Sequence, residues 1–133
     1  MARISINADE IRDWPSFHDL FATNCGFHSF YGRNMDAWID CMSYLDAPDD
    51  GMTTVHVQHG EVLVLDLGKL GDFPERCPEI FRSLVDCTAI VNYRRLINGD
   101  PAILTLAYSN QPITRGGHAW DIPVLIYKST LSE

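Results

Sequence analysis

Two aspartates, Asp36 and Asp40, give the sequence its clearest chemical signal. In an α-helix, side chains four residues apart stand next to each other, so these carboxylates would lie side by side on one face. Paired carboxylates act as a general acid and base only where their environments separate their pKa values. Two neighbours on an exposed face would both ionise. The pair therefore favours binding of a cationic partner over proton transfer, and we predict that the protein is not an enzyme and has no catalytic residue.

The run from residue 30 to residue 42 contains what a helix needs to position this pair. Asn34 is a good N-cap, because its side-chain oxygen can accept a hydrogen bond from a backbone N–H of the first turn. No glycine or proline occurs between Asn34 and Pro48. The apolar side chains that share one face of this helix are Met35, Trp38, Met42 and Leu45. We expect that face to be buried, which leaves Asp36 and Asp40 on a different face.

This run resembles the signature of the barstar family, small intracellular inhibitors of secreted ribonucleases such as barnase. The family signature reads aromatic-Tyr-Gly-x-Asn-Leu-Asp-Ala-x-x-Asp-Cys-Leu. The residues that match it are Tyr31, Gly32, Asn34, Asp36, Ala37, Asp40 and Cys41, with Met35 and Met42 as apolar equivalents. The resemblance covers about residues 2–109 of the chain. It implies an α/β, barstar-like fold in which a small parallel β-sheet is packed with helices.

The function that the resemblance implies is inhibition through an acidic helix. The carboxylates would take the positions of RNA phosphates in a basic ribonuclease site without offering a cleavable bond. Opposite electrostatic fields raise association rates by about 10–1,000-fold, an effect for which the barnase–barstar pair is itself a reference case. The partner would be a basic protein, a ribonuclease or a related toxin. The residues that the resemblance assigns to the partner-binding surface are Phe30, Tyr31, Arg33, Asn34, Asp36, Ile39, Asp40 and Ser43.

The chain departs from the family pattern at positions that bear on the target. Phe30 lacks the tyrosine hydroxyl often found at its position, and Ile39 stands where barstar presents a contacting tryptophan. Arg33 replaces an acid, and residues 93–95 (Tyr-Arg-Arg) are basic where barstar uses a glutamate on its last helix. A target other than barnase therefore remains open. Two other functions also remain as alternatives: a non-nuclease, protein-binding regulatory module on a barstar scaffold, and a small-molecule enzyme with an acidic pocket.

The N-terminal half predicts a strand, a helix and a hairpin around this run. Residues 3–7 alternate polar and apolar side chains, which is typical of a strand. Asp13 is a candidate N-cap for a first helix that Gly26 can end. Strand-like runs at 53–57 and 61–67, with a short turn between them, predict an added β-hairpin. The second run is almost entirely apolar, which is expected of a strand buried on both faces.

The C-terminal half predicts a helical crossover between two parallel strands. Helical spacing covers residues 78–98, as one helix or as two with a break at 86–88. Residues 102–108 are typical of a buried strand, and a helical crossover to it implies a parallel pair with a right-handed connection. Residues 120–127 predict a C-terminal edge strand, because Pro123 removes one donor from the ladder.

The composition favours a single domain that binds neither membranes nor nucleic acid. The 133 residues carry a net charge of −8, whereas nucleic-acid binding requires clustered lysine and arginine. No apolar run approaches the ~18 residues of a membrane span, and no signal segment is evident. We expect a cytoplasmic protein with one barstar-like domain over residues 1–133, consisting of a family core at about 2–109 and an extension at 110–133. Its oligomeric state is open.

The cysteines and histidines give no indication of a cofactor or a metal site. The four cysteines form no Cys-x-x-Cys pair, which removes the usual zinc and thioredoxin-type patterns. His56 and His59 would point to opposite faces of a strand, so they could not easily share an ion. We therefore expect no cofactor, no metal and reduced thiols.

Overall fold

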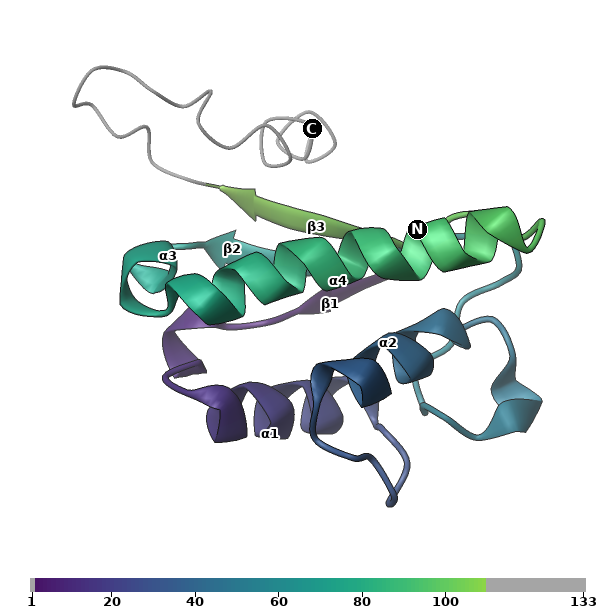
Figure 1. The fold of residues 1–133 in the computed structure, drawn as a ribbon, viewed down its shortest axis with the longest axis horizontal. Helices are drawn as coiled ribbons and strands as arrows, with labels where there is room; N and C mark the ends of the chain where they lie inside the picture. Colours follow the sequence, from purple (N-terminus) through teal and green to yellow (C-terminus); the bar gives the residue numbers. More distant parts are fainter. Residues whose placement is uncertain (1, 110–133) are drawn as a thin grey trace.

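In residues 2–109, which the computed structural model describes, three parallel strands form one sheet and helices connect them. The strands are β1 (Ala2–Ser5), β2 (Leu63–Lys69) and β3 (Leu104–Ser109), in the order β1-β2-β3. The α-helices are α1 (Trp14–Cys25), α2 (Met35–Ser43), α3 (Phe73–Arg76) and α4 (Pro78–Ile97), and the short 3-10 helices are η1 (Ala8–Glu10) and η2 (Pro48–Asp50). The predicted α/β fold with a small parallel sheet is confirmed (Figure 1).

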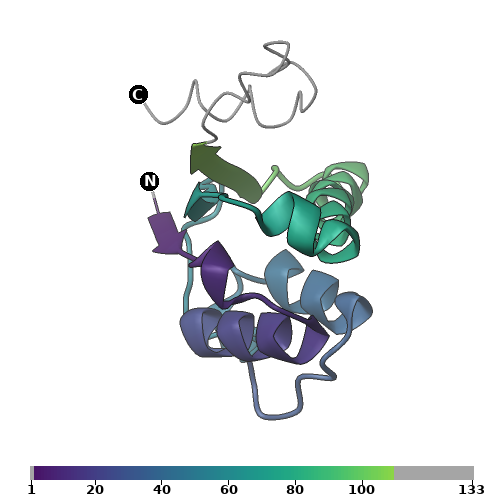
Figure 2. The same cartoon turned by 90° about the vertical axis from the view of Figure 1, so that its left-hand side faces the viewer.

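β2 is the central strand, and its register determines where the core lies. Leu65 pairs with Ile4 of β1 and with Leu106 of β3, and all three side chains belong to the core or pack against it. The opposite face of the sheet carries an ion pair between Arg3 and Asp66 at 2.7 Å. As its apolar sequence predicts, β2 is largely buried on both faces. Figure 2 shows the strands along one side of the molecule, with the helices beside and below them.

α1 begins and ends where the sequence predicts. Asp13 and Ser16 form a capping box, in which the Asp13 carboxylate accepts a hydrogen bond from the Ser16 N–H at 2.9 Å. Gly26 follows the helix with a φ of 65°, the left-handed conformation that glycine adopts without strain. A Cβ on Gly26 would also lie 1.7 Å from Oγ1 of Thr54. The position therefore requires glycine for space as well as for conformation.

α4 is one continuous helix. Of the two predicted possibilities, one helix or two helices with a break, the single helix is confirmed. The Asn92 side chain fixes it to the start of β3. Its oxygen accepts hydrogen bonds from the N–H groups of Ile103 and Leu104 at 2.9 and 3.1 Å, and its nitrogen donates to the Leu104 carbonyl at 2.9 Å. Because α4 also packs on α2, the position of α2 relative to the sheet is fixed through α4.

The predicted hairpin is wrong. Residues 53–57 form no strand, and their backbone instead covers the C-terminal ends of α1 and α2. The Thr54 N–H donates to the Gly26 carbonyl at 2.9 Å, and the Val57 N–H donates to the Leu45 carbonyl at 3.0 Å. The physical reason lies in the sheet: β2 already has a parallel neighbour on each side, so neither of its edges is open to an antiparallel partner.

The apolar face of α2 is part of the core, as its spacing predicts. Trp38 is fully buried and meets Phe21 of α1 edge to face, with 5.6 Å between ring centroids. Met42 and Leu45 are buried beside it. The expected extension at 110–133, including the edge strand, lies outside the described residues.

Gly26→Ala should destabilise the fold more than Gly51→Ala. Both glycines have a positive φ, 65° and 69°, so either alanine costs about 1–2 kcal/mol of backbone strain. At Gly26 the new Cβ also collides with Thr54, whereas at Gly51 nothing lies within 4 Å of it. The collision adds about 1–3 kcal/mol. Urea unfolding measures both changes, and equal losses of unfolding free energy would contradict the close approach of Thr54.

Candidate functional site

α2 presents Asp36 and Asp40 on its exposed face, as their spacing predicts. Asn34 is the N-cap: its side-chain oxygen accepts a hydrogen bond from the Ala37 N–H at 2.8 Å. Asp36 lies in the first turn, where the partial positive charge of the helix N-terminus favours a carboxylate. The buried Trp38 on the opposite side prevents the helix from rotating. The carboxylates are therefore held at the surface by the packing of the helix that carries them.

The two carboxylates differ in their partners. Arg94 of α4 approaches Asp40 with 3.5 Å between Nη1 and Oδ1, and both side chains are about half exposed. An exposed ion pair of this kind contributes about 0–1 kcal/mol to stability. No basic side chain within residues 2–109 forms an ion pair with Asp36. Within the described part of the chain, an outside cation thus meets no competing cation at Asp36, whereas at Asp40 it meets competition from Arg94.

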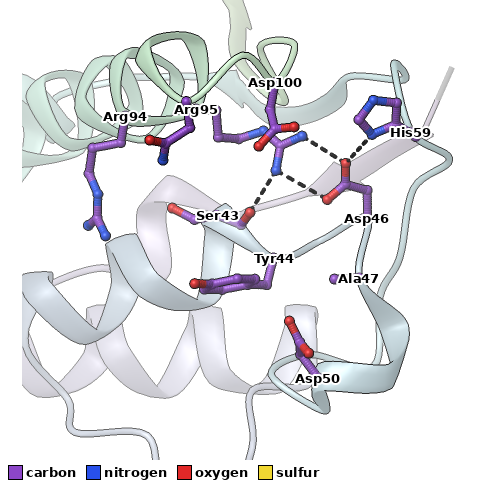
Figure 3. A pocket seen from close by; sticks show the side chains of 10 residues that line it. Ser43, Tyr44, Asp46, Ala47, Asp50, His59, Arg94, Arg95 and Asp100 are labelled. Atoms are coloured by element: carbon purple, nitrogen blue, oxygen red, sulfur yellow. Dashed lines mark hydrogen bonds and ion pairs between the residues drawn. The ribbon is translucent and has the colours of Figure 1, made fainter.

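A buried ion pair fixes the end of α2 to the end of α4 (Figure 3). Arg95 and Asp46 are joined by two hydrogen bonds of 3.1 and 2.7 Å, and their side chains are only 8% and 9% exposed. Arg95 also donates to the carbonyls of Ser43 and Pro101, both at 2.8 Å, and His59 lies 3.0 Å from the same carboxylate. Burial alone would raise the pKa of Asp46, but the hydrogen bonds with Arg95 and His59 outweigh it and lower that pKa.

The loop that leads into α2 is anchored to α1 at two points, of which Tyr31 is the first. Its hydroxyl lies 2.5 Å from Nδ1 of His18, a buried residue of α1 that stacks on Trp14. Burial, reinforced by the nearby Arg33, lowers the pKa of His18, and burial raises the pKa of Tyr31. The imidazole is therefore neutral at pH 7, and its Nδ1 shares a hydrogen bond with the Tyr31 hydroxyl.

Arg33 is the second anchor of this loop. Its backbone is left-handed, with a φ of 57°, a conformation that costs a residue with a side chain about 1–2 kcal/mol. The guanidinium group donates to Asp19 at 2.9 Å and to the Pro15 carbonyl at 3.2 Å, and these contacts with α1 help to hold the strained turn in place. Phe30, close to both anchors in the chain, is 88% exposed. The loop thus presents an aromatic ring to solvent a few residues before the helix that carries the carboxylates.

The structure leaves most of the predicted surface residues exposed or half-buried, and it buries one. Those exposed are Phe30, Arg33, Asn34, Asp36 and Asp40, and those half-buried are Tyr31 and Ser43. Ile39 is only 6% exposed and belongs to the core, so the expectation that it flanks the carboxylates is corrected. It lies four residues after Met35 and three before Met42, which places it at the edge of the buried stripe. The Ser43 hydroxyl is engaged within its own helix, donating to the Ile39 carbonyl at 2.6 Å.

Sequence reasoning missed the contacts that hold this surface in place. The side chains concerned are His18, Asp46, His59, Arg94 and Arg95. Their partners lie 13 to 54 residues away along the chain. One signal was available in the sequence, because two consecutive arginines, Arg94 and Arg95, occur in one predicted helix. Neighbours on a helix point about 100° apart, so one of the two is expected to point toward the element that packs on α4. A buried arginine in turn requires a carboxylate or other acceptors.

Next to the Arg95–Asp46 pair lies an open hollow of about 330 Å³, whose lining includes Tyr44, Asp50, Arg94 and Asp100 (Figure 3). Its lining mixes carboxylates and cations. Ser43 contributes the serine hydroxyl of this lining, and that hydroxyl donates a hydrogen bond to a backbone carbonyl. This mixture of charges is suited to binding another charged surface.

Three further features of the described residues bear on other kinds of site. Among the described residues, no three His, Cys, Asp or Glu side chains are grouped so that they could hold a metal ion. None of the described helices is both long and apolar enough to span a membrane. All four cysteines are buried and unpaired, and burial, together with the Asp40 carboxylate, raises the pKa of Cys41 to about 11. At neutral pH Cys41 is therefore a thiol packed in the core.

A family model described as Barstar (barnase inhibitor) matches residues 1–96. The matched region runs from β1 into the last turn of α4, so it contains every residue of the surface described above. A search of the curated proteins found no match.

Asp46→Ala should destabilise the protein by about 3–5 kcal/mol, because it leaves the Arg95 guanidinium buried without a countercharge. Asp49→Ala is the matched control, since Asp49 is an exposed carboxylate in the neighbouring turn, and surface changes of this kind stay within about 0.5 kcal/mol. Urea unfolding at pH 7 measures both. A loss for Asp46→Ala no larger than that of the control would show that the ion pair does not stabilise the fold.

His18 should make the fold sensitive to mild acid. Its pKa is lowered in the folded protein from the ordinary 6.5, so as the pH falls below about 6.5 the unfolded chain takes up a proton that the folded chain does not. Stability should therefore fall with pH below that value, by at most about 1.4 kcal/mol per pH unit from this group. Unfolding free energies at pH 7.5 and 5.5 should differ more for the wild type than for His18→Gln. Equal differences would contradict the neutral, buried imidazole.

Proposed function

Because the chain belongs to the barstar family, we propose that it binds and blocks a ribonuclease or a related basic toxin through the exposed carboxylates of α2. At the level of the family, the function is inhibition of barnase-type ribonucleases. We place this inhibition in the bacterial cytoplasm, where an immunity protein protects the cell that makes the toxin.

The observation that carries the proposal is the rigid presentation of Asp36 and Asp40. They stand side by side on a helix that is capped by Asn34 and fixed at its other end by the ion pair of Arg95 with Asp46. Groups that are already held in the binding geometry lose little conformational entropy when a partner docks. Carboxylates in this arrangement can meet cations that a ribonuclease site offers to RNA phosphates, and they contain no bond that the enzyme can cleave.

The loop before α2 supports the same proposal by supplying apolar contact. Phe30 is a large, exposed aromatic ring in the loop before α2, and rings of this kind are frequent anchors in protein interfaces. The loop that carries it is held by the contact of Tyr31 with His18 and by that of Arg33 with Asp19. Exposed carboxylates on a helix that follows a preformed loop with an exposed aromatic ring suit a protein partner better than a small molecule.

The net charge of −8 supports attraction of a basic partner from a distance. Long-range attraction between opposite charges raises association rates and weakens as salt is added, since the Debye length is about 8 Å at physiological ionic strength. An inhibitor of a toxin benefits from fast association, because each free toxin molecule acts until it is bound.

A regulatory partner that is not a nuclease is the second candidate. The observation that favours it is the ion pair of Asp40 with Arg94, which lowers the negative charge at one half of the carboxylate pair. A ribonuclease assay on the bound partner separates the two candidates.

Asp36→Ala and Asp40→Ala should each weaken the complex by about 2–5 kcal/mol, because each leaves a cation of the partner without its countercharge. Affinity capture from a lysate of the source organism, with the wild type and the double variant as baits, isolates the partner, and titration calorimetry measures the single variants. Glu75→Ala, which removes an exposed carboxylate from α3, is the control and should leave affinity unchanged. Unchanged affinity in both aspartate variants would refute the proposed surface, and a captured partner that does not cleave RNA would favour the regulatory candidate.

A further inference from the structure

α4 runs alongside α2 and packs against it (Figure 1). Arg94 of α4 reaches Asp40. Nearer the start of α2, burial and the nearby carboxylates, Asp36 among them, raise the pKa of the Cys87 thiol of α4. Asp40 therefore lies on the side of α2 that faces α4, and Asp36 is close enough to α4 to affect Cys87.

Arg94 lies between these carboxylates and a stripe of exposed apolar side chains. Ile90, Tyr93 and Ile97 are exposed on α4, and Arg94 follows the first by four residues and precedes the last by three, so it is their neighbour on the helix surface. A protein that docks on Asp40 meets Arg94 as part of the same surface.

The fold has little need of a positive charge at Arg94. Its side chain is about half exposed, and its ion pair with Asp40 is long, at 3.5 Å, so it contributes about 0–1 kcal/mol. The next residue, Arg95, makes the buried contacts that join α4 to α2. A charge that packing does not require, placed inside a binding surface, acts chiefly on whatever binds there.

We propose that Arg94 determines the specificity of this surface: it disfavours a ribonuclease site that is basic throughout and selects a partner whose basic site is bordered by a carboxylate that meets Arg94. This inference rests on the proposed function of α2. Like charges brought together in an interface are repulsive, and such repulsion discriminates between partners as effectively as attraction does. With a carboxylate opposite Arg94, the same residue strengthens the complex and releases Asp40 for a cation of the partner.

Barnase, the ribonuclease named in the family's description, is the probe for the repulsive half of the proposal. Inhibition of RNA cleavage by purified barnase is measured for the wild type, Arg94→Gln and Arg94→Glu, after urea unfolding has shown that each variant is folded. Arg94→Glu should inhibit about tenfold more tightly than the wild type and Arg94→Gln about threefold, mainly through faster association, and the gain should shrink as salt is raised. Arg82→Glu is the matched control, because it reverses another exposed charge of α4, and it should change inhibition by less than about twofold.

Three outcomes separate this inference from the proposed function. If Arg94→Glu inhibits barnase no better than the wild type, or no better than Arg82→Glu, Arg94 does not determine the specificity of this surface and the inference is wrong. The same conclusion follows if none of these proteins inhibits barnase. If Arg94→Glu gains inhibition that Asp36→Ala in the same chain removes, both proposals stand. If the gain survives Asp36→Ala and Asp40→Ala together, barnase is bound elsewhere and the α2 surface itself is refuted.

The partner captured by the wild type tests the attractive half. For that partner Arg94→Glu should weaken binding by about tenfold or more, the opposite sign to its effect on barnase, because a carboxylate would then face a carboxylate. Stronger binding of the captured partner by Arg94→Glu would overturn the proposed carboxylate opposite Arg94 while leaving the role of Asp36 and Asp40 intact.

Discussion

The buried ion pair between Arg95 and Asp46 is the interaction on which the geometry of the binding surface depends. It joins α4 to the segment that follows α2, and through the Ser43 and Pro101 carbonyls it also holds the last residue of α2 and the connection to β3. Removing two charges from water is costly, and their attraction offsets that cost only where the remaining donors and acceptors are also satisfied. Here four hydrogen bonds of Arg95 and the contact of His59 with the carboxylate meet that condition.

Arg94 and Arg95 are consecutive in α4 but serve different purposes, because Arg95 is buried and Arg94 is about half exposed. Arg95 points inward and is 8% exposed, so its charge organises the protein itself. Arg94 points toward Asp40 at the surface, where water and salt weaken its effect on folding and an incoming protein displaces that water. The difference arises from about 100° of helical rotation between neighbours, which turns one guanidinium toward the segment after α2 and leaves the other beside the carboxylates.

The loop that leads into α2 is also held by contacts with another helix, in this case α1. The left-handed backbone at Arg33 is strained, but contacts with α1 on both sides of Gly32 hold it: Tyr31 with His18, and Arg33 with Asp19. The conformation of the loop is therefore fixed, with Phe30 exposed and Asn34 in position to cap the helix. Strain held by surrounding contacts is a recurrent feature of functional segments, and here it lies immediately before the carboxylates.

The sequence by itself determined the local elements: the caps at Asp13 and Asn34, the turn at Gly26, the buried strand β2, the helical character of residues 78–98 and the exposure of Asp36 and Asp40. Each depends on residues within a few positions of one another, so spacing and side-chain type are enough. The tertiary structure alone decided that residues 53–57 cover helix ends instead of pairing in the sheet, that Ile39 is buried, and that Arg94 faces Asp40. Those outcomes depend on which distant segments share space, and no local pattern encodes a contact between residues 54 positions apart.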